Sequence, residues 1–279
     1  MTNLKVLLFL SAVSLVSHAQ ASQGKLIATA GLLQVEGAGG GGLVPWATLS
    51  GYDTQDEISV SAGMTQVSLR DYRLQTVSVN ASFYDQVELS LSKQTFDLST
   101  LGGDIKQNIV GIKYRLLGDA VYSKWPQISV GIMHKSLEDK SIANALGASS
   151  TSGTDIYLAA TKVHLGAVFG YNAVWGLTAR ATKANEIGLL GFGSENNDSY
   201  KVMAEATLGL LFSRNLAIGV EYRQKPDNLG LKEDDWADIF ITYIPTKSVN
   251  FTLAWTDLGT IAGAPKQQGL YVSISGQLF

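Results

Sequence analysis

The segment that decides the fold is residues 200–212, YKVMAEATLGLLF, in which apolar side chains alternate with polar or small ones. One set of alternate residues is Tyr200, Val202, Ala204, Ala206, Leu208, Leu210 and Phe212, and the other is Lys201, Met203, Glu205, Thr207 and Gly209. Successive side chains of an extended strand point to opposite faces. One face of this segment therefore suits lipid and the other suits water.

The same alternation recurs along the chain in segments of about 10 residues, separated by turn-forming residues, as in transmembrane barrel strands. It is clearest in residues 58–64, 87–91, 110–116, 128–132, 216–223 and 249–255. No window beyond residue 21 approaches the run of about 18 apolar residues that a membrane-spanning helix needs. The sequence therefore predicts an all-β, antiparallel transmembrane β-barrel. A soluble exported β-sandwich is the alternative, but it would not need aromatic residues at both ends of successive strands.

The connectors between these segments are of two kinds that alternate, which predicts the topology. Short connectors are residues 52–56, 83–85, 169–172, 212–215 and 243–248, and longer ones are 97–104, 137–154, 185–198, 225–234 and 259–266. Bacterial barrels have short periplasmic turns and longer external loops, and an even number of strands. If residues 24–36 and 44–51 are both strands, the count is about 14. The alternative is 12 strands, with the first part of the mature chain folded into the lumen.

The N-terminus has the three regions of an export signal. Lys5 is the basic residue, residues 6–16 are the apolar core, and Ala19-Gln20-Ala21 is the cleavage site. We expect residues 1–21 to be the signal peptide and residues 22–279 to form the barrel, placed in the outer membrane after passage through the periplasm.

Composition excludes several classes of protein. The chain has 279 residues, 46% of them hydrophobic and 16% charged, with no cysteine. It is too apolar for a disordered protein, and it cannot contain a disulfide, a thiolate metal site or a lipidated cysteine. Its 21 basic and 24 acidic residues are interspersed, so we expect no nucleic-acid partner. Cytoplasmic cofactors such as NAD are scarce outside the cytoplasm, and we expect none here.

Aromatic residues lie near the ends of the predicted strands, as in the two aromatic girdles of membrane barrels. The inner set is Tyr52, Phe83, Tyr84, Trp125, Phe169, Tyr171, Phe212 and Tyr243, and the outer set is Phe96, Tyr200, Tyr222, Trp236 and Trp255. The amphipathic last segment, with Tyr271 and Gly276, ends in Phe279. It is similar to the signal by which the barrel-assembly machinery recognises its substrates, although Phe279 is out of phase with the apolar face.

Three stretches carry a family resemblance. Residues 31–52, GLLQVEGAGGGGLVPWATLSGY, together with DYRL at 71–74 and VELSLSKQTFD at 87–97, resemble a family of Gram-negative outer-membrane proteins catalogued only as a domain of unknown function. The resemblance spans most of the mature chain. It implies an exported barrel and supplies no activity, ligand or catalytic residue.

The glycine run GAGGGG at residues 37–42 matches the spacing G-x-G-x-x-G of a dinucleotide-binding turn. Such a turn must open a helix, whereas Pro45 and a strand-like segment follow here. We interpret the run as an external turn or as backbone packed closely inside the lumen.

The mature chain has two histidines, and neither has metal ligands at suitable spacing. His134, near Ser136, Glu138 and Asp139, raises the alternative of a lipid-modifying enzyme with a histidine-activated serine. No nucleophile motif surrounds it, so we expect no catalytic residue. We place His164 on the lumen face by its alternation with Val163 and Leu165.

Charged residues in the polar phase of the strands form the candidate functional set. With His164, these predicted lumen-lining residues are Glu88, Lys113, Arg115, Arg180, Lys201, Glu205, Glu221 and Arg223. A charge facing lipid costs about 2–4 kcal/mol near the midplane, so we expect these side chains to point inward. We interpret the protein as a narrow passive channel for small solutes. A plugged barrel with a structural role in the envelope, its interior charges paired, is the alternative. Oligomeric state stays open.

Overall fold

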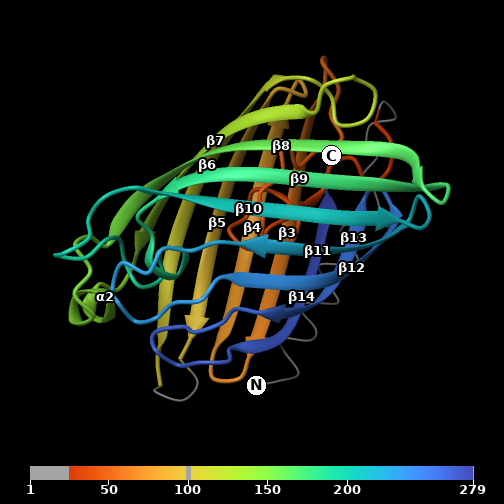
Figure 1. Ribbon diagram of the computed structural model, residues 1–279. Helices are drawn as coiled ribbons and strands as arrows, with labels where there is room; N and C mark the ends of the chain where they lie inside the picture. The colour runs from red at the N-terminus through yellow and green to blue at the C-terminus, as the bar shows by residue number, and fades with distance from the viewer. Residues whose placement is uncertain (1–24, 99–101, 279) are drawn as a thin grey trace.

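The structure is a computed structural model that describes residues 25–98 and 102–278. Within them, strands β3 to β14 form one closed antiparallel barrel (Figure 1). The strands are β3 (Ile58–Leu69), β4 (Arg73–Phe83), β5 (Val87–Asp97), β6 (Asp104–Leu117), β7 (Gln127–Leu137), β8 (Ser152–Val168), β9 (Tyr171–Thr182), β10 (Lys201–Leu211), β11 (Leu216–Arg223), β12 (Trp236–Thr246), β13 (Val249–Asp257) and β14 (Gln268–Gln277). The predicted fold class is confirmed, with 12 strands in the barrel.

The barrel closes because the last strand pairs with the first. Each strand is hydrogen-bonded to its neighbour in the sequence, and β14 pairs with β3 in a register that sets Tyr271 opposite Val67. Closure leaves no strand edge unpaired, which is what a sheet within a hydrocarbon layer requires. The backbone polar groups are therefore satisfied within the wall, and only the side chains of the inner face need to be polar.

The outer surface of the barrel is an apolar belt. Side chains such as Leu91 on β5 and Val110 on β6 are 58% and 55% exposed, whereas the alternating residues on the same strands are buried inside. Large apolar surfaces of this extent are not left in water, and a closed barrel with such a belt is a membrane-spanning structure. The protein is an outer-membrane β-barrel. Among the described residues, no helix is long and apolar enough to cross a membrane.

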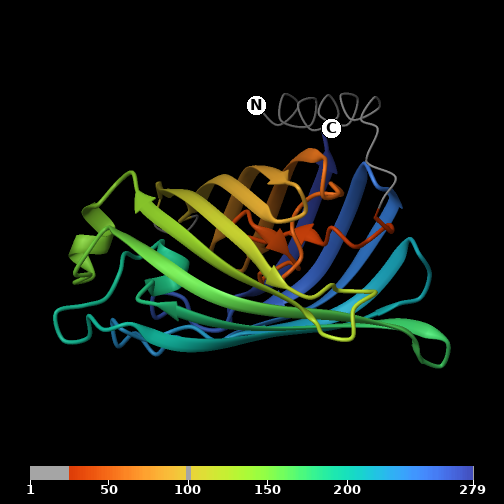
Figure 2. The same cartoon turned by 90° about the horizontal axis from the view of Figure 1, so that it is seen from above.

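The prediction of 14 strands was wrong, and the 12-strand alternative is what the structure shows. Residues 30–53, which we call the plug, lie inside the barrel and not in its wall (Figure 2). They form only a two-residue pair of strands, β1 (Leu32–Leu33) and β2 (Gly39–Gly40), and otherwise turns. Strand parity did not separate the two counts, because both are even.

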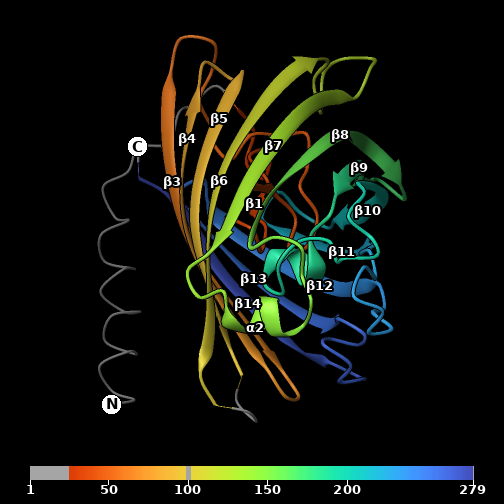
Figure 3. The same ribbon diagram turned by 90° about the vertical axis from the view of Figure 1, so that its left-hand side faces the viewer.

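The two ends of the barrel differ as the connectors predicted. Short turns lie at one end, and the other end carries the longer loops, with the short helix α2 (Ser141–Ala145) and the 3-10 turn η2 (Asn185–Gly188) (Figure 3). We assign the short turns to the periplasm. Exposed rings such as Trp125 and Phe169 mark that end. Three residues of the predicted girdles were misplaced, because Tyr52, Phe96 and Trp236 are buried.

The outer mouth is covered by packed loops. One buried apolar cluster contains Ile187 of η2, Leu189 and Leu190 just after it, and Leu258 and Ile261 after β13. This cluster also contains Val35 and Leu43 of the plug, so the loops and the plug share a core. The predicted signal peptide, residues 1–21, and Phe279 lie outside the described residues.

Candidate functional site

Glycines allow the plug backbone to approach the charged wall. A Cβ at Gly41 would lie 1.9 Å from Glu221 Oε1, and one at Gly39 would lie 2.8 Å from Glu88 Oε2. The run at residues 37–42 is therefore backbone packed closely inside the lumen, one of the two interpretations of the sequence. Only glycine leaves room there for a carboxylate to reach the main chain.

Two wall carboxylates accept hydrogen bonds from plug N–H groups. Glu221 on β11 accepts from Gly42 N at 2.7 Å and from Leu43 N at 2.6 Å. Glu88 on β5 accepts from Gly39 N at 2.9 Å and from Ser50 N at 2.7 Å. Hydrogen bonds to an ionised group are stronger than those between neutral groups, so these two residues fix both sides of the glycine run.

Lys113 on β6 completes the contact with Glu88. Its Nζ lies 3.3 Å from Glu88 Oε2 and donates to the carbonyls of Gly39 at 2.7 Å and Thr48 at 2.9 Å. All of these groups are buried. A charged pair from neighbouring strands thus binds the N–H and C=O groups of one stretch of plug.

Glu36 is the only plug residue whose side-chain charge enters the wall cluster in the described structure. Its carboxylate pairs with Lys135 on β7, with Arg223 at 2.7 Å and with Arg180 at 3.2 Å. Asp155 and Glu205 complete the cluster, Asp155 lying 2.6 Å from Lys135 Nζ and Glu205 2.5 Å from Arg180 Nε. Three acidic and three basic groups are therefore balanced only while the plug is in place.

Uncharged wall side chains hold the rest of the plug backbone. Val35 O accepts from Thr76 Oγ1 and Gln94 Nε2, each at 2.8 Å. Ala47 O accepts from Gln127 Nε2 at 2.8 Å and Ser129 Oγ at 2.6 Å. The plug has little secondary structure of its own, and wall side chains replace the partners that a strand ladder would supply.

Six of the nine predicted lumen residues lie deep inside the barrel: Glu88, Lys113, Arg180, Glu205, Glu221 and Arg223. Arg115 lies at the periplasmic rim, where it pairs with Asp85 and, at 3.2 Å, with Asp119. Lys201 is the first residue of β10, at the outer end of the strand. It shares the inward face with Met203 and Glu205. The first six all contact the plug or a residue that does.

The placement of His164 in the lumen was wrong. It is exposed, and Trp175 Nε1 donates to its Nε2 at 3.0 Å. Its neighbours Val163 and Leu165 are the ones that line the interior. Near the periplasmic end of β8 the inward residues are apolar, which reverses the polarity of the two faces seen elsewhere in the wall while the strand phase is unchanged.

The predicted assembly residues have structural positions of their own. Tyr271 is fully buried inside the barrel. Gly276 lies opposite Val249 on one side and Ala62 on the other, and Phe279 lies outside the described residues. Recognition by the assembly machinery stays a prediction.

Sequence reasoning missed Glu36, Lys135 and Asp155, the centre of the charged cluster. Lys135 follows Gly131 and Met133 in the inward phase of β7, and Asp155 precedes Tyr157 and Ala159 in the inward phase of β8. Their alternation was visible in the sequence. Glu36 had no such signal, because the segment containing it was interpreted as a barrel strand.

Several buried wall atoms have no hydrogen-bond partner among the described residues. They include both carboxylate oxygens of Asp238 on β12, the hydroxyls of Ser61, Ser82 and Tyr271, and Asn80 Oδ1. A buried polar atom without a partner costs about 1–3 kcal/mol. The inner wall thus carries more polar groups than the plug engages.

A second charged contact lies at the outer mouth. Lys225 Nζ is 2.6 Å from Glu186 on the loop after β9 and 2.8 Å from Glu233 on the loop after β11. Glu186 and Ile187 both have left-handed backbone conformations, at φ 46° and 55°, which non-glycine residues adopt at a cost. Burial raises the pKa of Glu186 to about 8, against the opposing effect of Lys225. This loop is therefore held inward under strain.

His134 does not carry a catalytic arrangement in the described structure. Its Nδ1 lies 3.0 Å from Thr154 Oγ1 on the outer surface, so the contact is with a threonine and not with the serine of the alternative interpretation. Among the described residues, no three His, Cys, Asp or Glu side chains gather as metal ligands would.

Comparisons with solved structures give likenesses at low identity. A structure described as "KdgM porin" has a TM-score of 0.49 at 12% identity, covering 77% of this chain and 98% of its own. The Acinetobacter baumannii outer membrane protein Omp33 has a TM-score of 0.49 at 8% identity, covering 80% and 100%. Outer membrane phospholipase A from Escherichia coli has a TM-score of 0.38 at 10% identity, covering 80% and 94%. These values carry no inference about activity or solute.

Sequence comparison gives the family. No curated protein matches the chain. One family model, described as "Protein of unknown function (DUF3034)", matches residues 29–275 and so spans the plug and almost the whole barrel. The chain belongs to this family of outer-membrane β-barrel proteins of unknown function, DUF3034.

Proposed function

We propose that the protein is a passive channel for small solutes that is closed at rest by the plug. The observation that carries the proposal is the polar inner wall behind the plug. Along most of the barrel the inward residues are Ser, Thr, Asn, Gln or charged, even where the plug covers them.

A permanently filled interior has no need of such a wall. Buried charges and hydroxyls are costly, and apolar residues of similar volume fill a core equally well or better. A wall that is periodically exposed to water must be polar. The unpartnered atoms of Asp238, Ser61, Ser82 and Asn80 are groups that water would satisfy once the plug moves.

The contacts of the plug also fit a movable element. Beside the apolar packing of residues such as Val35 and Leu43, wall side chains hold the plug by hydrogen bonds and ion pairs to its backbone and to the carboxylate of Glu36. Water can replace each of these polar contacts. Passage further requires that the loops at the outer mouth open, since Ile187 and Leu190 pack there with the plug.

The structural alternative, a barrel that never opens, is favoured by the charge balance of one interior cluster. In the cluster around Glu36, the carboxylates of Glu36, Asp155 and Glu205 face the cations of Lys135, Arg180 and Arg223 in equal number. The two functions predict different behaviour once that balance is disturbed, because only a channel would then conduct.

Single-channel current in a planar bilayer distinguishes them. We expect rare openings from the unaltered protein and frequent openings from Glu36→Gln, because the variant leaves the wall cations without their plug partner. Glu195→Gln, the same change on an exposed outer loop, should behave like the unaltered protein. A third variant, with residues 34–46 replaced by a short Gly-Ser linker, removes most of the plug. If this variant is folded, as judged by heat-modifiable gel mobility, and passes no current, the channel proposal is wrong.

A further inference from the structure

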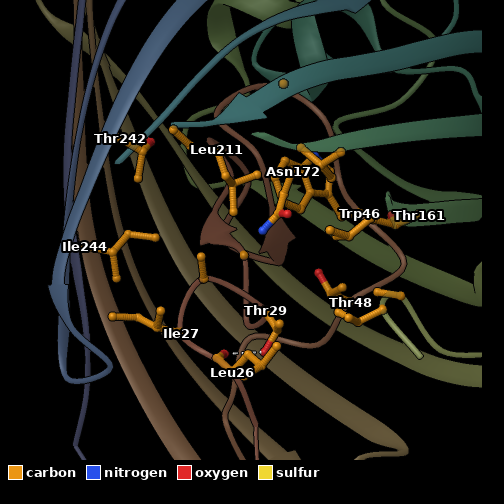
Figure 4. A pocket seen from close by; sticks show the side chains of 18 of the residues that line it. Leu26, Ile27, Thr29, Trp46, Thr48, Thr161, Asn172, Leu211, Thr242 and Ile244 are labelled. Atoms are coloured by element: carbon orange, nitrogen blue, oxygen red, sulfur yellow. Dashed lines mark hydrogen bonds between the residues drawn. The ribbon is translucent and has the colours of Figure 1, made fainter. Parts of the chain in front are cut away.

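A cavity of about 80 Å³ lies at the periplasmic end of the lumen (Figure 4). It is bounded by the plug and residues 26–29 on one side and by strands β8 to β12 on the other. Ile27 and Trp46 line it on one side, and Val174, Phe240 and Ile244 of the wall line it on the other. None of the residues that line it is charged. It differs in this from the middle of the lumen, where charged side chains fill the space between plug and wall.

The wall of this cavity is apolar because the inward residues of β8 and β9 change from polar to apolar near the periplasmic end, in an unbroken strand phase. Val163 on β8 and Val174 on β9 are register partners, and both line the cavity. The next inward threonines toward the middle of the same strands bond to the plug: Thr161 Oγ1 accepts from Ala47 N, and Thr178 Oγ1 donates to Pro45 O. Inward apolar side chains beside an aqueous mouth are unfavourable unless something apolar covers them.

One buried hydroxyl of the cavity lining is unused. Thr48 is 6% exposed and lines the cavity, and its Oγ1 has no hydrogen-bond partner among the described residues. The three other hydroxyls of the lining are already engaged, since Thr161 Oγ1 accepts from Ala47 N, Thr29 Oγ1 donates to Leu26 O and Thr242 Oγ1 is hydrogen-bonded to Thr252 Oγ1. A buried hydroxyl normally has a partner, so Thr48 is the group that a ligand would meet.

We propose that this cavity binds a small neutral amphiphile, a molecule with an apolar body and one hydrogen-bonding group such as an alcohol. The apolar lining takes the body, and Thr48 Oγ1 takes the polar group. A charged ligand would lose its hydration with no counter-charge in the lining. Leu26 and Leu165, which line the cavity and are exposed, mark the mouth through which the ligand enters from the periplasm.

The size of the cavity limits the part of the ligand that is enclosed. A cavity of roughly 150 Å³ lined by apolar residues encloses benzene, so about 80 Å³ encloses a shorter body. A chain of a few carbons fits, with any longer part extending through the mouth. The shortest probe with this chemistry is therefore a linear alcohol such as 1-pentanol.

Protection of a single thiol tests the site without a measurement of current, so its outcome is independent of the channel proposal. The chain has no cysteine, and Val163→Cys places one thiol in the cavity wall while keeping Thr48. We expect 1-pentanol to slow the reaction of this thiol with methyl methanethiosulfonate several-fold. Pentylammonium at the same concentration should not slow it. A cysteine at Ser194, on an outer loop, should react at the same rate with or without the alcohol.

The hydroxyl of Thr48 is tested in the same background. Thr48→Val should raise the 1-pentanol concentration needed for half-protection about 2- to 10-fold, which is the loss of one neutral hydrogen bond. Thr29→Val is the matched control, because it removes a hydroxyl of the same cavity that is already engaged, and it should leave that concentration unchanged. Equal protection by pentylammonium, absence of protection by 1-pentanol, or protection that Thr48→Val does not weaken would each overturn the proposal.

Discussion

The middle and the periplasmic end of the lumen hold the same chain by different forces. In the middle, Glu88, Glu221 and the cluster around Glu36 bind the plug through charge and hydrogen bonds. At the periplasmic end, Val174 and Phe240 face Trp46 across a cavity with an apolar lining. The rule of a polar inner face and an apolar outer face therefore holds in the middle of the lumen and fails at its periplasmic end, where the inner face is apolar. We expect substitutions of charge to lower stability most in the middle, and exchanges of polarity at constant shape to lower it at the periplasmic end.

The largest effect is expected from Arg180→Ala in the middle. Arg180 contacts Glu36, Asp155 and Glu205 at 3.2, 3.3 and 2.5 Å, and its loss leaves three buried carboxylates with two cations. Breaking a buried ion pair costs about 3–5 kcal/mol, so the free energy of unfolding in urea should fall by about that amount. Arg214→Ala, at an exposed periplasmic turn, is the control. An equal effect of the two substitutions would remove the distinction between lumen and surface charges.

Gly41→Ala should have the next largest effect. The added Cβ would lie 1.9 Å from Glu221 Oε1, so the carboxylate must move away from the N–H groups of Gly42 and Leu43. We expect a loss of about 1–3 kcal/mol in the same urea titration, as for other overpacked sites. Gly176→Ala is the control, since its Cβ would meet its nearest neighbour at 3.6 Å. If Gly41→Ala does not change the free energy of unfolding, the plug backbone is not held this close to Glu221.

Two isosteric exchanges should test the contrast at nearly constant volume. Val174→Thr puts a hydroxyl in the apolar end, and Thr178→Val removes the hydroxyl that donates to Pro45 O at 2.8 Å. Each should lower the free energy of unfolding by about 1 kcal/mol. If Val174→Thr leaves the free energy of unfolding unchanged while Thr178→Val lowers it, water reaches the periplasmic cavity and its apolar lining does not contribute to stability.

The smallest effect is expected at the outer loops and depends on pH. Because burial raises the pKa of Glu186 to about 8, the closed loop binds a proton that the open loop releases at a pKa near 4.5. The closed state is therefore most stable below that lower pKa and loses stability as the pH rises toward 8.

Cleavage of the loop around η2 by proteinase K measures this change. Cleavage should accelerate a few-fold from pH 5 to pH 8, relative to cleavage of an unstructured peptide, and Glu186→Gln should flatten the dependence. Glu195→Gln, on the same outer connection, should not flatten it. The same pH profile in Glu186→Gln as in the unaltered protein would assign the dependence to another group.

Alternation alone predicted most of the wall, because a strand between lipid and lumen must have one face of each kind. It assigned the inward phase correctly for residues such as Lys113, Arg180 and Glu221. It could not say what these charges contact, since their partners are backbone groups of Gly39, Gly42 and Leu43. Those partners lie in the plug, which has no strand or helix periodicity from which its packing could be predicted.

Two errors involve the same structural feature. Residues 24–36 and 44–51 were counted as wall strands to give an even strand number, although many of their residues are apolar, and His164 was placed inside because Val163 and Leu165 are apolar. In both places apolar residues point into the lumen, where they pack in the plug or line the periplasmic cavity. A sequence gives the phase of a strand, but it does not show which face meets lipid when the interior also has an apolar region.

The measurement that tests the central claim most directly is the current through a barrel whose plug can be tethered. Leu33 Cδ1 lies 2.8 Å from the position that a Cβ of Gly63 would take, so Leu33→Cys and Gly63→Cys place one thiol on the plug and one on β3 in a chain without other cysteines. In the Glu36→Gln background, we predict no current while the two cysteines are oxidised and discrete openings after reduction. Current that is the same before and after reduction, in protein shown to be fully cross-linked, would contradict a lumen closed by its own N-terminal segment.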